Sequence, residues 1–238
     1  MPDTAVPAHP FDPLTAAEIE QAVALVRGDG RLGERVSFWG AVLDEAHARS
    51  VPGERRVRIV VTDHAVPAAW EVDVVLGAAP QKSAQCVEWR PIDHRRPGVT
   101  SDEARAAAQA CRNSPLFKEV LAKRGIHDVS LVMVDAESMG GFEPARYAGR
   151  RLTWGTVWHR VDEGDNGYVR PVQGVVPIID MHAMEVLEVE DHGVVPLSDE
   201  AGPLEPGAFG PDRPGLRALD VVQPDGPSFT VDGQLVEW

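Results

Sequence analysis

A capped helix followed by about four β-prone segments occurs twice in this chain, and this repeat constrains the fold more than any other feature. The first unit begins at Thr15–Glu18, where the Thr hydroxyl and the Glu carboxylate can each cap the other residue's backbone amide. Four apolar residues then follow at helical spacing: Ile19, Ala22, Val23 and Val26. Gly28 or Gly30 can end this helix in a left-handed turn.

The segments after this helix have the composition of strands. We predict strands over 36–43, 57–62, 70–76 and, more weakly, 85–89. Ser50–Glu54 predicts a turn between the first two of them. Pro91–Thr100 is dense in Pro, Gly and charge, which predicts a linker.

The pattern then restarts. Ser101 is the expected N-cap of a helix whose first turn carries two acids. Its apolar face is expected to hold Ala104, Ala107, Ala108 and Cys111. Ser114-Pro115 opens a further helix, which ends in Lys123-Arg124-Gly125. The residues it is expected to bury are Leu116, Phe117, Val120 and Leu121. Strands are predicted over 129–134, 151–159, 172–180 and 183–189, with a turn at Asn166-Gly167.

Helices grouped ahead of hairpin-linked strands predict an α+β fold with two similar domains, each built on an antiparallel sheet. From Pro196 to Pro227 the composition shifts to Pro, Gly and acid, which predicts a linker. Two short β-prone segments around Asp232-Gly233 then predict a terminal hairpin. An isolated hairpin is marginal in water, so it needs a sheet to join.

The charge and composition of the 238-residue chain exclude several classes of partner. A net charge of −14 excludes binding to nucleic acid or an anionic membrane through a basic field. The N-terminus lacks the basic and apolar regions of a signal peptide, and no apolar run is long enough to span a bilayer. Cys86 and Cys111 form no metal-like spacing or disulfide framework. A cytoplasmic protein is therefore expected.

Catalytic signatures are mostly absent. The chain has no Gly-rich phosphate loop, dinucleotide fingerprint, Gly-x-Ser-x-Gly, His-Glu-x-x-His or His-x-His. The densest polar cluster consists of Glu185, Glu188, Glu190, Asp191 and His192. It has the donor atoms of a metal site, but a solvated strand edge is the favoured interpretation. Asp180-Met-His182 either orients an imidazole or caps a turn, and the turn cap is favoured.

Two further groups of residues have a structural and a functional interpretation. The basic residues are Lys123, Arg124, Arg146, Arg150 and Arg151. They either form an anion site or neutralise local acids, and the second is favoured in an acidic chain. Trp154 and Trp158 lie on one face of a strand, where packing in a core or an interface is the expected use. The residues alone name no reaction.

Three stretches resemble copper-containing primary amine oxidases, in the order in which that family has them. Leu219–Gly233 is similar to the segment that enters the family's catalytic domain. Glu190–Pro196 resembles the exit from its second peripheral domain, and His9–Ile19 the entry to its first. The terminal stretch is the most specific of the three.

The resemblance implies a domain organisation. Residues 1–8 would be a tail, 9–95 an N2-like domain and 96–195 an N3-like domain. Both would be cystatin-like, with helices packed on a four-stranded antiparallel sheet. Residues 196–238 would be an extended linker followed by the truncated start of the catalytic β-sandwich, a partial hairpin.

The resemblance also implies what this chain lacks. In the family, a tyrosine in an Asn-Tyr-Asp/Glu-Tyr motif becomes topaquinone, three histidines hold copper and an aspartate is the base. Primary amines are oxidised to aldehyde, ammonia and hydrogen peroxide. Neither tyrosine of this chain, Tyr147 or Tyr168, follows an asparagine. We therefore assign no catalytic, cofactor-binding or metal-binding residue, and expect the chain to be inactive alone.

The implied partner is a copper amine oxidase catalytic domain, through which the family forms homodimers. The alternatives are a docking module for a separately encoded catalytic chain and the product of a degraded reading frame. Tyr168 precedes Pro171–Gly174, where some relatives have an aromatic that lines the substrate channel; an ordinary turn aromatic is the other interpretation. Ala136-Glu137 stands where members often have Pro-Trp, which implies a different channel wall.

Overall fold

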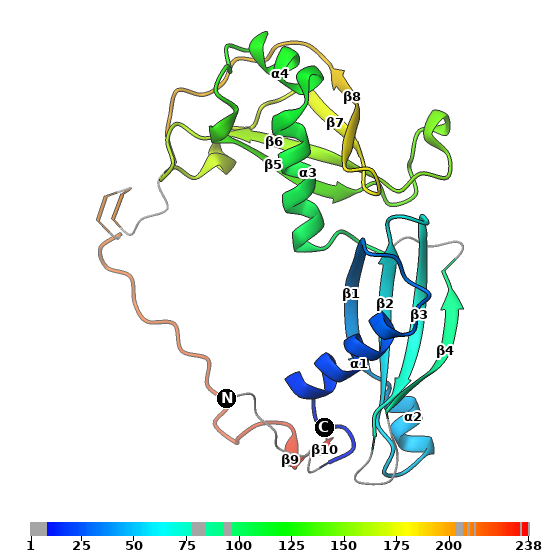
Figure 1. Ribbon diagram of the computed structural model, residues 1–238. Helices are drawn as coiled ribbons and strands as arrows, with labels where there is room; N and C mark the ends of the chain where they lie inside the picture. The colour runs from blue at the N-terminus through cyan, green and yellow to red at the C-terminus, as the bar shows by residue number, and fades with distance from the viewer. Residues whose placement is uncertain are drawn as a thin grey trace. The chain divides into compact units, whose positions relative to one another are not determined.

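The computed structural model describes residues 9–77, 84–92, 97–202, 207–208, 210–211, 213–233 and 235–237. The chain divides into two compact units, residues 1–203 and residues 204–238. The first unit contains two four-stranded antiparallel sheets with helices packed on each (Figure 1). The α+β prediction is therefore confirmed.

The first sheet has the strand order β1-β2-β3-β4. Its strands are β1 (Val36–Leu43), β2 (Arg56–Asp63), β3 (Ala68–Val75) and β4 (Gln85–Pro91). Helix α1 (Ala16–Gly28) packs on this sheet and begins with the predicted capping box. The buried core consists of Ala22, Val26, Val57, Ile59, Val61, Val72, Val74 and Leu76. In β2, Val57, Ile59 and Val61 alternate with the less buried Arg58 and Val60, as the period of a strand requires, whereas the second half of β3 is buried on both faces.

A short helix, α2 (Glu45–Ser50), lies between β1 and β2, where only a turn was predicted. Asp44 caps it by accepting a hydrogen bond from the His47 amide. With six residues and a single buried side chain, Ala48, this helix has no apolar periodicity from which to predict it.

The second sheet has the strand order β5-β6-β7-β8. Its strands are β5 (Val132–Ser138), β6 (Leu152–His159), β7 (Val175–Asp180) and β8 (Glu185–Asp191). Helices α3 (Ser101–Asn113) and α4 (Pro115–Ala122) pack on it, and short 3-10 turns occupy 129–131, 145–147 and 167–169. The core gathers small residues from α3, including Cys111, larger ones from α4, including Phe117 and Leu121, and Val157 and Ile179 from the sheet.

Three details of this part differ from the prediction. The N-cap of α3 is Thr100, not Ser101, because Glu103 lies three residues after Thr100 and completes a reciprocal capping box with it. Leu116 is exposed, since the buried stripe of α4 begins one residue later at Phe117. Residues 129–131 form a 3-10 turn capped by Asp128 rather than the start of a strand.

The second unit contains the predicted hairpin, in which β9 (Thr230–Asp232) pairs with β10 (Leu235–Glu237). Gly233 has φ 58°, a left-handed conformation that suits the tight turn. Val231 and Val236 pair across the hairpin and are both exposed. Trp238 lies outside the described residues. None of the described helices is long and apolar enough to cross a membrane.

Candidate functional site

A cluster of buried polar side chains lies where the two sheets of the first unit meet. His64 follows β2 of the first sheet and Glu103 lies in the first turn of α3. Arg151 immediately precedes β6, and His182 lies in the turn between β7 and β8. All four side chains are less than a tenth exposed, so each polar atom depends on partners within the protein in place of water.

The centre of this junction cluster is the ion pair of Glu103 and Arg151. The two guanidinium nitrogens donate to the two carboxylate oxygens at 2.6 and 3.0 Å, and Arg151 also donates to the Gly98 carbonyl. Burial favours the neutral acid, but the hydrogen bonds from Arg151 and from the Thr100 amide outweigh it and lower the pKa of Glu103. Glu103 therefore stays charged beside its guanidinium.

His64 joins this ion pair to the first sheet. Its Nε2 lies 2.8 Å from Ser37 Oγ and 3.4 Å from Glu103 Oε1. Its Nδ1 lies 3.3 Å from the Nδ1 of His182, whose carbonyl accepts a hydrogen bond from Arg35 at 2.6 Å. Burial lowers the pKa of His64, although the carboxylate of Glu103 acts in the opposite direction. In this contact one Nδ1 donates and the other accepts, so the tautomers of the two imidazoles depend on each other.

The cluster contains a serine, a histidine and a glutamate, yet its geometry does not support nucleophilic catalysis. In a catalytic triad the serine and the acid occupy opposite nitrogens of the imidazole. Here Ser37 and Glu103 both approach Nε2. The cluster is a structural joint between the two sheets. Sequence reasoning singled out only Asp180–His182 and Arg151 of this region, because nothing in residue spacing brings His64 to Glu103.

The predicted turn cap at Asp180 is confirmed. Its Oδ1 accepts hydrogen bonds from the amides of His182 at 2.9 Å and Ala183 at 3.0 Å. These bonds lower the pKa of Asp180 although burial opposes them, and Arg150 contributes an ion pair at 2.9 Å. This capped turn between β7 and β8 sets the position of His182 in the junction cluster.

The basic residues neutralise local acids, as predicted. Arg124 donates to Asp191 at 2.7 Å, which lowers the pKa of Asp191 to about 2, and Lys123 adds a contact at 3.2 Å. Arg146 donates to Glu188 at 2.6 Å. Within the described ranges, no group of three or more His, Cys, Asp or Glu side chains is placed to hold a metal ion. Asp191 and Glu188 of β8 are therefore engaged by two arginines and a lysine.

Tyr168 lies in the 3-10 turn 167–169, more than half exposed. Its hydroxyl donates to Asp135 Oδ2 at 3.0 Å, which raises the pKa of the phenol, and its ring meets Trp158 edge-on at 5.0 Å. Trp158 alternates with the buried Val157, so it lies on the sheet face opposite the helices, as does the exposed Trp154. The two indoles are thus outside the helix-covered core.

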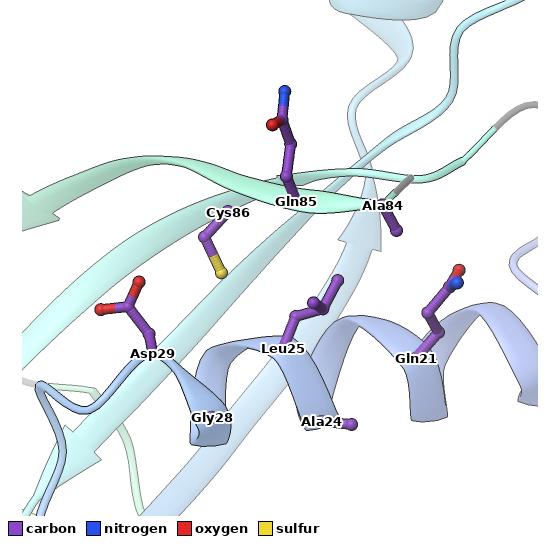
Figure 2. A pocket seen from close by; sticks show the side chains of 8 residues that line it. All are labelled: Gln21, Ala24, Leu25, Gly28, Asp29, Ala84, Gln85 and Cys86. Atoms are coloured by element: carbon purple, nitrogen blue, oxygen red, sulfur yellow. The ribbon is translucent and has the colours of Figure 1, made fainter. Parts of the chain in front are cut away.

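A pocket of about 530 Å³ lies between α1 and β4 of the first sheet. Figure 2 shows Cys86 on β4 and Leu25 on α1 pointing into the space between these elements. Burial, reinforced by the nearby carboxylate of Asp29, raises the pKa of the Cys86 thiol. The thiol stays protonated at neutral pH, so this pocket has no activated nucleophile.

Comparison with known proteins relates this chain to one family. Residues 102–202 match the family model described as the copper amine oxidase N3 domain. The chain is 31% identical to a primary amine oxidase of Arthrobacter sp. (strain P1), over 97% of this chain and 35% of that protein. It is 30% identical to a peroxisomal copper-containing diamine oxidase of Nicotiana tabacum, with the same shares covered. A primary amine oxidase of Klebsiella aerogenes is 26% identical over 97% of this chain and 31% of its own length. The chain thus spans about a third of the length of these relatives.

Proposed function

This chain carries the N3 domain of the copper amine oxidase family and corresponds to the N-terminal region of its members, and we propose that it serves as the non-catalytic part of a primary amine oxidase. The observation that carries the proposal is the match over 97% of the chain, which reaches only about a third of each relative. The parent reaction would be oxidative deamination of primary amines to aldehyde, ammonia and hydrogen peroxide.

We assign residues 9–95 to an N2-like domain, 96–195 to an N3-like domain and 196–238 to the linker and the start of the catalytic domain. The matched range 102–202 supports the second assignment. One helix-covered four-stranded sheet falls in each of the first two ranges, which supports both.

The residues present do not fit copper or topaquinone. The sequence has no His-x-His, and neither of its tyrosines follows an asparagine. Both tyrosine hydroxyls are engaged by acids, Tyr147 by Glu188 and Tyr168 by Asp135. We therefore place no step of amine oxidation on this chain, and assign both cofactors to the catalytic domain of the parent family.

The expected partner is such a catalytic domain, which would also supply the homodimer contact. Exposed aromatic side chains support a docking role: Phe142 is 82% exposed and Trp154 39% exposed. In the second unit, Leu219 and Val221 are both more than nine-tenths exposed. Exposed large apolar side chains of this kind, present in each unit, are available for contact with a partner. We propose that Tyr168, which is half-exposed beside Trp158, forms part of the wall of the substrate channel.

The cysteines Cys86 and Cys111 are free, which supports a reducing compartment such as the cytoplasm.

The first test asks whether the purified chain has any part of the chemistry. We expect no stoichiometric copper by elemental analysis after incubation with Cu²⁺ and dialysis. We also expect no peroxide above a blank with methylamine, phenethylamine or tyramine. Stoichiometric copper or peroxide release would overturn the assignment.

The second test measures docking. The chain should co-purify with a copper amine oxidase catalytic domain that lacks its own N-terminal region, and restore its activity. Trp154→Ser should weaken this association. The matched control is Val66→Ser, another exposed apolar residue, which lies between β2 and β3 of the first sheet. Absence of association at micromolar concentration would refute the docking role and leave the product of a degraded reading frame as the alternative.

A further inference from the structure

A groove lined by three arginines lies between α3 and the outer strand β5 of the second sheet. Figure 1 shows α3 lying across the sheet that contains this strand. The polar residues of this arginine groove are Arg105, Gln109, Arg112, Asp135 and Arg160, and its volume is about 410 Å³. It is separate from the junction cluster, and it adjoins Tyr168, whose hydroxyl donates to the groove residue Asp135.

The charge of the arginine groove is opposite to that of the chain. Three arginines and one aspartate line the groove, whereas the chain as a whole has a net charge of −14. The carboxylate, Asp135, already accepts a hydrogen bond from the Tyr168 hydroxyl. A local excess of positive charge in an acidic protein attracts anions to this groove rather than to the rest of the surface.

The three guanidinium groups are only weakly committed to protein partners. Arg105 pairs with Asp102 on the surface, where both side chains are mostly exposed and the pair is easily exchanged. Arg112 donates to a neutral group, the Gln109 side-chain oxygen, at 3.0 Å. Both arginines lie on α3 and retain further N–H donors, since a guanidinium has five.

Arg160, which follows β6, is the third arginine that lines the groove. One of its terminal nitrogens donates to the Glu163 carbonyl at 3.2 Å. Its Nε is buried, and within the described part of the chain it has no hydrogen-bond partner. Because this nitrogen has no exposed surface, a ligand in the groove would be held by the terminal nitrogens of Arg160 and not by its Nε.

We propose that the arginine groove binds a small polyanionic metabolite, either an organic phosphate or a di- or tricarboxylate. A guanidinium matches the oxygens of a phosphate or a carboxylate in a bidentate geometry, and three of them around one groove favour a ligand with two or more negative charges. A volume of about 410 Å³ lies within the range of pockets that hold metabolite-sized ligands. The site is distinct from amine oxidation, and no step of that reaction depends on it.

The test is a titration of the full 238-residue chain with inorganic pyrophosphate and, separately, with citrate at constant ionic strength. Binding is followed by amide chemical shifts and by calorimetry. We expect saturable binding of at least one of the two anions, with shifts concentrated on α3 and β5 and an affinity that falls as salt rises. Saturation by pyrophosphate alone assigns a phosphate ligand, and saturation by citrate alone assigns a carboxylate.

Arg105→Gln and Arg112→Gln should each weaken this binding by about tenfold, because each removes a charge-assisted hydrogen bond. Both residues are on the surface of α3, so these variants should fold. The matched control is Arg49→Gln, an exposed helical arginine paired with an acid on α2, which should leave the affinity unchanged. Shifts that grow linearly without saturating, equal loss in the control, or binding of a polyglutamate peptide without either small anion would overturn the proposal.

Discussion

Replacing Glu103 with Gln tests how much the junction cluster contributes to stability. Gln keeps the size of the side chain and can still accept from the Thr100 amide at the start of α3, because Glu and Gln serve alike in a capping box. The substitution removes the negative charge that faces Arg151 at 2.6 and 3.0 Å. The guanidinium, whose side chain is 5% exposed, is then left buried without a counter-charge.

The expected loss is about 3–5 kcal/mol, the cost of breaking a buried ion pair by removing one partner. This is a large share of the roughly 5–15 kcal/mol by which a domain is stable. With a urea m-value of about 2 kcal/mol/M, the unfolding midpoint should fall by about 1.5–2.5 M. The double variant Glu103→Gln/Arg151→Gln should be more stable than Glu103→Gln alone, since it leaves no uncompensated charge.

Urea unfolding followed by circular dichroism and tryptophan fluorescence measures these losses. The matched control is Glu45→Gln, which removes the acid of an exposed ion pair with Arg49 and should cost less than about 0.5 kcal/mol. A loss of less than about 1 kcal/mol in Glu103→Gln, or a double variant less stable than the single one, would show that the buried pair does not hold the junction.

Three further predictions concern single residues. The pKa of His64 is lowered from 6.5 in the folded state, so the unfolded chain binds more protons below that pH. Stability should be level above about pH 6.5 and fall as the pH drops below it. His64→Asn should reduce this fall in urea titrations, whereas His192→Asn, at an exposed site, should not. Gly98→Ala would place a Cβ 2.8 Å from a carbon of the Trp39 indole and should lower the stability in thermal unfolding by about 1–3 kcal/mol. The control is Gly28→Ala, whose Cβ would meet nothing within 4 Å and should not destabilise the fold. Burial raises the pKa of Cys111 to about 12, so iodoacetamide at pH 8 should modify it only after unfolding; modification in the native protein would contradict its burial.

Local signals in the sequence predicted most of the secondary structure. The box at Thr15–Glu18, the Pro at the start of α4 and the Asp-Gly turn of the last hairpin each act within a few residues, so their outcome depends little on the rest of the fold. The wrong prediction of the N-cap of α3 was also a matter of neighbouring residues. Thr100 and Ser101 are both capping residues, and the choice between them required counting to Glu103.

The sequence by itself determined two helix-and-sheet units, the terminal hairpin and the absence of the family's catalytic motifs, because these depend on residue type and short spacing. The tertiary structure alone decided which polar residues meet. His64 and Glu103 are 39 positions apart by number and Glu103 and Arg151 are 48 apart, yet they share one buried cluster. The arginine groove likewise combines α3 with Arg160, which follows β6. Such contacts arise from the packing of one element against another, which the periodicity of residues along the chain does not predict.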